Sequence, residues 1–299
     1  MLLLSGERNF GVSLNKPYLN VLPLNELPTF TGTCADLLIM VCHKLVVNGQ
    51  RTLDSLYNCF LTIISNISPY LKSMCLPACS KLLNLFEIFS SERYLLSQET
   101  NHQYVFFLMD IFNNIIQYQY GGNAHLIYAI IRRRDSFDRL FNLSLSDKST
   151  QASTNDNTQV ESTADDEEKT DAKPSDVQIK KEPAKGFAPT AEWLNDWKSR
   201  LPKSTVLRLL QHLVPQVENL CKRNAGSVDE DLVLQFLQKT TMVGLLPVPH
   251  PIIVRRYQPN KFTNIWFSTY LWGVIYLKNQ RMPLFDGTKI SLFHVHVGQ

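Results

Sequence analysis

The residues between 33 and 143 carry apolar side chains at helical spacing in five consecutive segments, and this pattern constrains the fold more than any other. Apolar residues recur every three or four positions, as they do on a helix that buries one face. Short loops join the segments, so each helix must bury its apolar face on its neighbours. We therefore predict an all-α protein that forms an irregular α-solenoid-like helical array. The predicted helices cover residues 33–49, 52–68, 70–89, 103–118 and 124–134, and the last can continue to residue 143.

Local signals place the ends of these helices. Thr33 and Asp36 match a capping box, in which each side chain accepts a hydrogen bond from the other residue's backbone amide. Pro69 ends the second helix, and Pro77 lies inside the third and predicts a kink there. Residues 5–32, in contrast, contain glycine or proline at short intervals and predict irregular structure.

Residues 144–186 form a predicted disordered acidic linker. Residues 147–186 contain ten acidic residues, six basic residues and no aromatic residue. A segment so poor in apolar residues cannot offset the entropy that ordering costs. Lys180 lies in a hydrophobic-Lys-x-Glu modification pattern, although so short a pattern also arises by chance. The chain is thus predicted to have a first part of the array over residues 1–143, the linker, and a second helical part over residues 187–299 that closes the array.

The second part contains an unusual succession of prolines and aromatic residues. Helical patterns begin near Thr190, Ser204 and Val228 and end near residue 240. Prolines at positions 247, 249 and 251 then forbid helix, because each removes an amide donor and biases the preceding residue to extended geometry. Aromatic residues gather in residues 265–277. The alternation over residues 289–296 predicts a strand that pairs with residues 252–257 in a small β patch near the carboxyl terminus.

The chain offers no recognisable catalytic constellation. It contains none of the motifs typical of nucleotide-binding loops, zinc proteases or serine hydrolases, so we expect no enzyme activity, no cofactor and no small-molecule substrate. Cys75 and Cys79 lie one helical turn apart, and His294 and His296 share one face of a strand, so each pair offers two metal ligands. Further ligands do not stand nearby in the sequence, so buried sulfur and surface histidines are the favoured interpretations.

Charge and cysteine usage narrow the class of protein further. The formal net charge of +3 argues against a dedicated nucleic-acid-binding protein, so we expect no nucleic acid as partner. The six cysteines are scattered through apolar or helical contexts and are interpreted as reduced core residues. The apolar runs all fall short of the roughly 18–20 residues that a membrane-spanning helix needs.

Two groups of side chains are candidates for contact with a partner or a lipid. Cationic groups attract phospholipid headgroups and acidic protein surfaces, but they are also favourable at helix carboxyl ends. The candidate contact residues are Arg132, Arg133, Arg134, Arg255 and Arg256. Aromatic residues at helical spacing either pack in the protein core or lie in a bilayer interface. The lack of a charged face opposite them favours the core for Trp266, Phe267, Tyr270, Trp272 and Tyr276.

Several blocks of the sequence resemble one family. VGLLPVPHPIIVRRYQ at residues 243–258 and WFSTYLWGVIYL at residues 266–277 resemble the carboxyl end of the Hid family, the high-temperature-induced dauer formation proteins, which are relatives of dymeclin. Further blocks resemble the same family in the same order, on both sides of the linker. They are LLSGERNFGV (3–12), LNKPY (14–18), SPYLKS (68–73), FNNIIQYQY (112–120), YAIIRRR (128–134) and LVPQVE (213–218).

The resemblance implies a large, all-helical, non-enzymatic peripheral membrane protein on the cytosolic face of the Golgi. It implies a scaffold or adaptor role in trans-Golgi trafficking and in sorting of cargo into dense-core secretory granules, with other trafficking or tethering proteins as partners. Family members attach to the Golgi membrane through an amino-terminal myristoylated glycine. This chain begins Met1-Leu2 without that glycine, so we expect it to correspond to the carboxyl portion of such a protein.

An alternative hypothesis is a peripheral lipid-binding module, or an enzyme, built around the carboxyl-terminal aromatic segment. Its polar groups would be Arg255, Arg256 and His250. Binding to anionic lipid would distinguish the lipid-binding module from a scaffold.

The linker generates the first testable prediction. Deletion of residues 147–186 should leave the thermal unfolding midpoint nearly unchanged, because a disordered segment contributes little buried surface. The measurement is thermal unfolding followed by circular dichroism, with the intact chain as control. A large drop in the midpoint would contradict the prediction.

Overall fold

A computed structural model of the chain describes residues 1–19, 30–145, 187–223, 230–258 and 260–278. The chain divides into two compact units, Met1–Arg255 and Arg256–Gln299. The described residues are helical, without a β-strand; an isolated bridge joins Pro17 to Thr33. The all-α prediction is thereby confirmed.

The 3₁₀ helices are η1 (Gln50–Leu56), η2 (Ser68–Tyr70) and η3 (Tyr120–Gly122). The α-helices are α1 (Leu2–Ser5), α2 (Arg8–Ser13), α3 (Cys34–Gly49), α4 (Tyr57–Ile67), α5 (Leu76–Ser90), α6 (Glu92–Leu95), α7 (His102–Tyr118), α8 (Ala124–Arg132), α9 (Arg134–Phe141), α10 (Ala191–Arg200), α11 (Ser204–Arg223), α12 (Glu230–Lys239) and α13 (Lys261–Lys278).

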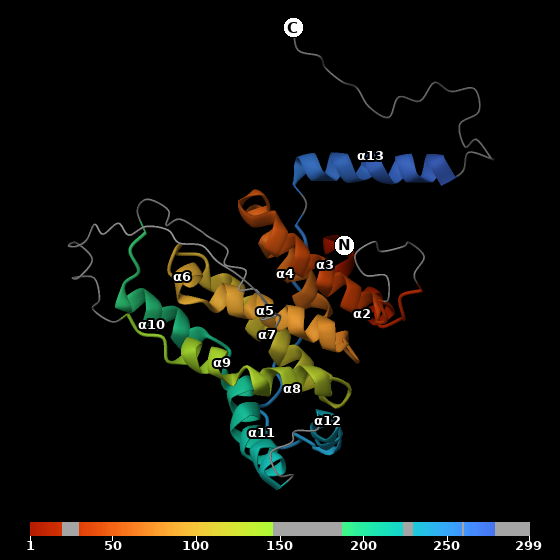
Figure 1. The fold of residues 1–299 in the computed structure, drawn as a ribbon. Helices are drawn as coiled ribbons and strands as arrows, with labels where there is room; N and C mark the ends of the chain where they lie inside the picture. The colour runs from red at the N-terminus through yellow and green to blue at the C-terminus, as the bar shows by residue number, and fades with distance from the viewer. Residues whose placement is uncertain (20–29, 146–186, 224–229, 259, 279–299) are drawn as a thin grey trace, which may run out of the picture. The chain divides into compact units, whose positions relative to one another are not determined.

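Helices α5 and α7 lie at the centre of the first unit. In Figure 1, α3 and α4 lie on one side of them and α8, α11 and α12 on the other. Helix α5 packs against α3, α7 and α8, while α7 packs against α4, α5 and α11. Helix α12 completes the array by packing on α8. Helices α10, α11 and α12 therefore belong to the same compact unit as the helices that precede residue 143.

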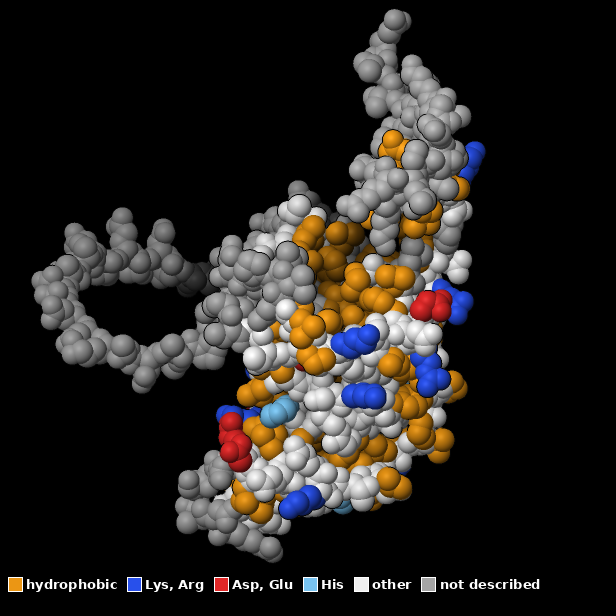
Figure 2. Space-filling model, turned by 90° about the vertical axis from the view of Figure 1, so that its right-hand side faces the viewer, with side chains coloured by type: hydrophobic (Ala, Val, Ile, Leu, Met, Phe, Trp, Pro, Cys, Tyr) orange, Lys and Arg blue, Asp and Glu red, His pale blue; other side chains and the backbone are white. Residues whose placement is uncertain are grey.

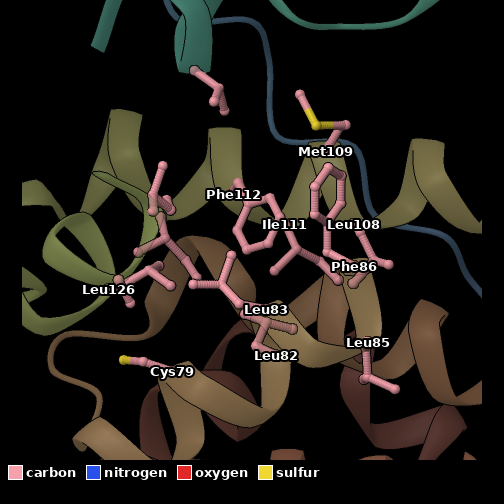
Figure 3. Packing of buried hydrophobic residues seen from close by; sticks show 14 of the residues in the cluster. Cys79, Leu82, Leu83, Leu85, Phe86, Leu108, Met109, Ile111, Phe112 and Leu126 are labelled. Carbon is pink, nitrogen blue, oxygen red and sulfur yellow. The ribbon is translucent and has the colours of Figure 1, made fainter. Parts of the chain in front are cut away.

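Aromatic and aliphatic side chains fill the space between α5, α7, α8 and α9. The rings of Phe86 and Phe137 are stacked with centroids 4.3 Å apart, and Phe112 meets both edge-on at 5.7 and 5.8 Å. All three side chains are fully buried. Figure 3 shows Leu83 and Phe86 of α5 pointing toward the side chains of α7, among them Phe112. Offset aromatic contacts of this kind add to the free energy gained from burial alone.

Asparagine and glutamine side chains join α7 to its neighbours. Asn113 donates from Nδ2 to the Pro202 carbonyl at 2.7 Å, and Gln117 donates from Nε2 to Thr205 Oγ1 at 3.1 Å. Asn114 donates in the same way to Ser68 Oγ at 2.9 Å. The first two bonds fix the turn between α10 and α11 against α7, and the third joins α7 to η2, because a buried amide group loses free energy if it lacks a partner.

The structure tests the local signals at the starts of α3 and α5. The capping box is confirmed, since the Thr33 amide donates to Asp36 Oδ2 at 2.8 Å and the Asp36 amide donates to Thr33 Oγ1 at 3.1 Å. The kink predicted at Pro77 is wrong. Helix α5 begins at Leu76, so Pro77 stands in its first turn, where the missing amide costs no hydrogen bond.

The amino-terminal segment is more helical than predicted. Residues 5–32 were predicted to be irregular, yet α2 forms over Arg8–Ser13. Gly11 permits this helix to approach Tyr70, because a Cβ atom at position 11 would lie 2.8 Å from Tyr70 Cδ2. Glycine weakens an isolated helix, but here it allows the close packing that stabilises it.

The predicted β patch is not formed within the described part of the chain. Residues 252–257 are not assigned to a strand, and their predicted partner, residues 289–296, lies outside the described residues. From residue 146 onward, the predicted linker also lies outside them. Among the helices that the structure describes, every one is too short or too polar to cross a lipid bilayer.

The aromatic cluster generates a prediction about stability. Replacement Phe86→Ala should lower the free energy of unfolding by about 3–5 kcal/mol, because it removes buried apolar surface and leaves a cavity beside Phe112 and Phe137. Val41→Ala on the exposed face of α3 is the control and should change it by less than about 1 kcal/mol. Chemical denaturation measures both variants. Equal losses would show that the cluster is not part of the stabilising core.

Candidate functional site

The candidate arginines fall at two places in the structure. Arg132, Arg133 and Arg134 lie at the junction between α8 and α9, which we call the arginine junction. Arg255 is the last residue of the first unit, whereas Arg256 is exposed and belongs to the second. Within the first unit, the structure therefore does not bring the arginine junction and Arg255 together into one basic patch. On the face shown in Figure 2, Lys and Arg side chains are scattered among hydrophobic ones.

The backbone at Arg133 sends the three side chains of the arginine junction in different directions. Helix α8 ends at Arg132, Arg133 has φ −108° and ψ 25°, and α9 begins at Arg134. Because this residue interrupts the helix, consecutive arginines no longer follow helical spacing. The single helix predicted over residues 124–143 is thus divided in two.

Each arginine of the junction pairs with a different helix. Arg132 Nη1 lies 2.9 Å from Glu230 Oε1 of α12, and Arg134 Nη1 lies 2.6 Å from Glu218 Oε1 of α11. Arg133 Nε lies 3.5 Å from a carboxylate oxygen of Glu87 in α5. Arg133 Nη1 also donates to the Ser80 carbonyl at 3.3 Å. The junction thus connects α8 and α9 to three other helices.

These ion pairs orient the helices more than they stabilise the fold. The side chains of Arg132 and Glu230 are 63% and 54% exposed, and pairs so accessible to water contribute about 0–1 kcal/mol each. Contact of the junction with a lipid or an acidic partner stays a prediction. It would compete with these internal carboxylates for the same guanidinium groups.

A pocket of about 580 Å³ lies beside the arginine junction, between α8, α9, α11 and α12. Three cationic and three acidic side chains line it, together with apolar surface from Tyr128, Val214 and Val217. Because the charges balance and several are paired, the pocket has no strong preference for an anion or a cation. The charged lining residues are Arg132, Arg134, Lys222, Asp135, Glu218 and Glu230.

The segment that contains the three prolines, residues 244–255, crosses the helical body without helix or strand, and we call it the strap. Side chains of the helices hold its backbone. The Tyr118 hydroxyl donates to the His250 carbonyl. Asn66 forms a double hydrogen bond with Arg255, accepting from the Arg255 amide at 2.8 Å and donating to its carbonyl at 2.9 Å.

The Arg255 side chain adds three further contacts at the end of the strap. Nη1 donates to Ser65 Oγ at 2.9 Å, and Nη2 donates to Asp110 Oδ2 at 2.7 Å. The guanidinium carbon lies 4.7 Å from the centre of the Phe107 ring, a cation–π distance. Arg255 thus fastens the strap to both α4 and α7, and these internal contacts occupy the group that was predicted to meet a partner or a lipid.

Sequence reasoning missed Asn66 and Asp110 as partners of Arg255. Asn66 is only 1% exposed although it is polar, and it lies between buried isoleucines of α4. A polar residue on a predicted buried face signals a hydrogen-bond partner. The identity of that partner, 189 residues away in the chain, could not be read from the pattern.

The cysteine and histidine pairs show no metal centre in the ranges that the structure describes. Among these residues, groups of three or more potential His, Cys, Asp or Glu ligands are absent. Burial raises the pKa of the thiols of Cys75 and Cys79, and raises that of Cys42 to about 12, so they remain protonated near neutral pH. His294, His296 and Lys180 lie outside the described residues.

The interpretation of the carboxyl-terminal aromatic residues as core is wrong for the described residues. Within the second unit, Trp266 is 58% exposed, and Tyr270 and Trp272 are each 55% exposed. Tyr276 is 45% exposed, and Phe267 is half-buried. Single exposed apolar residues are common on protein surfaces, but a group of exposed aromatic residues of this size usually marks an interaction site.

The chain is similar to proteins of one family over most of its length. The family model described as "Dymeclin: Dyggve-Melchior-Clausen syndrome protein" matches residues 1–274. Human "Protein HID1" is 42% identical over 99% of this chain and 46% of its own length. The Dictyostelium discoideum "Protein HID1" is 30% identical over 99% of this chain and 43% of its own length. The chain therefore spans about half the length of these relatives.

A more distant relative covers only part of the chain. The Schizosaccharomyces pombe "Ubp5-interacting protein ftp105" is 27% identical over 48% of this chain and 16% of its own length. The search of solved structures returned no match.

The fastening of the strap generates a prediction. Arg255→Met should lower the free energy of unfolding by about 1–2 kcal/mol, since methionine keeps part of the apolar stem over Phe107 but loses the bonds to Ser65 and Asp110. Limited proteolysis within residues 244–254 should also accelerate. The neighbouring Arg256→Met is the matched control, because Arg256 is exposed, and should change neither measurement appreciably. Equal behaviour of the two variants would show that Arg255 does not fasten the strap.

Proposed function

Because the chain belongs to the Hid and dymeclin family, we propose that it is a non-enzymatic scaffold of the Golgi secretory pathway. In this proposal it lies peripherally on the cytosolic face of Golgi or trans-Golgi membranes. There it binds other trafficking or tethering proteins and assists the sorting of cargo into dense-core secretory granules. The observation that carries the proposal is the family match, which extends over both ordered parts of the chain.

The architecture of the first unit supports a scaffold function, because side-chain contacts hold its helices in fixed positions. The aromatic cluster packs α5 against α7, and amide side chains of α7 fix the turn between α10 and α11. The arginine junction then connects α8 and α9 to α5, α11 and α12. A body braced in this way can present surfaces to several partners with little loss of conformational entropy on binding.

Two observations on the described residues support a role without catalysis. The pocket beside the arginine junction is lined by balanced charges, and arginine–carboxylate pairs occupy several of them. The buried thiols have raised pKa values, which is opposite to the shift that activates a nucleophilic cysteine.

A relative supports the assignment of proteins as partners. The name of the fission-yeast relative states that it interacts with Ubp5. We extend from that name only the class of activity, which is binding of another protein, to this chain.

Proximity labelling in secretory cells tests the proposed function. The chain is expressed as a fusion with a labelling enzyme, and the labelled proteins are compared with those obtained from the Phe86→Ala variant and from the enzyme alone. We expect enrichment of trans-Golgi tethering and trafficking proteins with the native chain, and loss of that enrichment with Phe86→Ala, because the variant loosens the braced body.

The same cells provide a functional readout. In cells depleted of the endogenous relative, the chain should increase the fraction of a granule hormone that is stored and released on stimulation. Labelling confined to general cytosolic proteins, together with unchanged hormone storage, would contradict the proposal.

A further inference from the structure

Helix α13 exposes apolar side chains around most of its circumference. It extends from Lys261 to Lys278 and is about 27 Å long, at 1.5 Å per residue. Large apolar side chains are normally the most buried parts of a protein. A helix that is apolar all round is normally buried in a protein core or in a membrane. The exposed fractions on α13 include 78% for Phe262, 59% for Ile265, 58% for Trp266, 55% for Tyr270 and 58% for Leu271.

Local contacts, rather than packing, begin this helix. Asn260 and Thr263 form reciprocal bonds at its amino end, with the Thr263 amide donating to Asn260 Oδ1 and the Asn260 amide donating to Thr263 Oγ1, both at 2.9 Å. Such a cap satisfies amide groups that would otherwise lack a partner at a helix start. The helix can therefore begin at a defined position while its apolar surface remains available.

The first three turns of α13 have two chemically different faces. Phe262, Trp266 and Tyr270 follow one another at intervals of four residues and therefore form one stripe. The rings of Trp266 and Tyr270 are stacked, with centroids 5.3 Å apart and planes 7° from parallel. Lys261, Ser268 and the intervening Asn264 lie on the opposite side by the same geometry. In the last turns, apolar residues occur on every side.

The chain around α13 is basic and contains no acidic residue. Between Asp231 and Asp286 the sequence has six lysines and arginines and no aspartate or glutamate. Arg255 is engaged within the first unit, but Arg256 and Lys261 are exposed close to the start of α13. An acid-free basic segment complements a negatively charged surface, and each cation near anionic lipid contributes to binding.

We propose that α13 docks in the plane of an anionic phospholipid surface, with the stripe of Phe262, Trp266 and Tyr270 facing the acyl chains and Arg256 and Lys261 contacting the headgroups. Trp and Tyr suit this position because one end of each ring is apolar and the other forms hydrogen bonds with water or headgroups. Helix α13 is not long and apolar enough to span a bilayer, so it lies along the interface.

Charge and ring chemistry favour lipid over a second copy of the chain. Two copies of α13 would bring like charges of Arg256 and Lys261 into one assembly, with no acidic residue in this region to offset them. An anionic surface offsets them directly. The inference rests on α13 and its flanking charges, and it stands whether or not the chain acts in Golgi trafficking.

Vesicle flotation with the whole chain tests the proposal. The probes are vesicles of phosphatidylcholine alone and vesicles of phosphatidylcholine mixed with phosphatidylserine. We expect the chain to float with the mixed vesicles at low salt, to float poorly with the neutral vesicles, and to dissociate as salt screens the headgroup charge.

Matched variants locate the contact on α13. Trp266→Ser should weaken binding to the mixed vesicles roughly tenfold or more, because it removes a large apolar side chain from the interface. Its control is Val248→Ser, which changes a residue that is 90% exposed but lies outside α13. Lys261→Glu should weaken binding roughly tenfold at low salt, while Lys239→Glu, in the same acid-free segment but on α12, should have a smaller effect. Circular dichroism verifies that the variants keep their helix content.

Three outcomes would overturn the proposal. The first is failure of the chain to float with mixed vesicles at low salt. The second is equal loss of binding for Trp266→Ser and Val248→Ser. The third is a dimer that Trp266→Ser dissociates, in a chain that does not float. Proximity labelling reports on protein partners, so a negative flotation result would leave the proposed scaffold function standing. A negative labelling result would likewise leave the docking of α13 on lipid standing.

Discussion

The packing of α5 against α7 is the contact on which the rest of the first unit depends. Phe86, Phe112 and Phe137 meet there in one fully buried cluster, and α9 contributes the third ring. Since α3 and α8 pack on α5, and α4 and α11 pack on α7, a change in this contact shifts every later layer. Burial of apolar surface supplies the free energy, but it has no direction. The stacked and edge-on ring geometry gives the contact its specific orientation.

Polar contacts give the array its connectivity. Amide groups of α7 reach the turn before α11, the arginine junction reaches three helices, and the double hydrogen bond of Asn66 holds the strap. Each bond contributes little free energy, because water competes for the same groups when the structure opens. Their value lies in geometry. They join segments that are separated by the longest stretches of sequence, where apolar packing alone would allow the helices to slide.

Much of the fold was predictable from the sequence, whereas most of the candidate site was not. Helical spacing located α3, α7 and α10, and the capping box at Thr33 formed as expected. Pro77 and Gly11 misled because the cost of such a residue depends on its position in a helix and on its neighbours. Arg255 and Arg256 look alike in the sequence. Only the position of Asp110, Ser65 and Asn66 separates the fastened side chain from the exposed one.

The sequence by itself determined the all-α class, the positions of several helices, the absence of helix across the three prolines and the family, because periodicity, capping residues and prolines act over a few neighbouring residues. The tertiary structure decided which polar residues are paired and which apolar residues are left exposed. It placed the three candidate contact arginines at positions 132–134 in three separate ion pairs. It also left the aromatic stripe of α13 exposed. Those outcomes depend on contacts between residues far apart in the chain, and no local pattern encodes them.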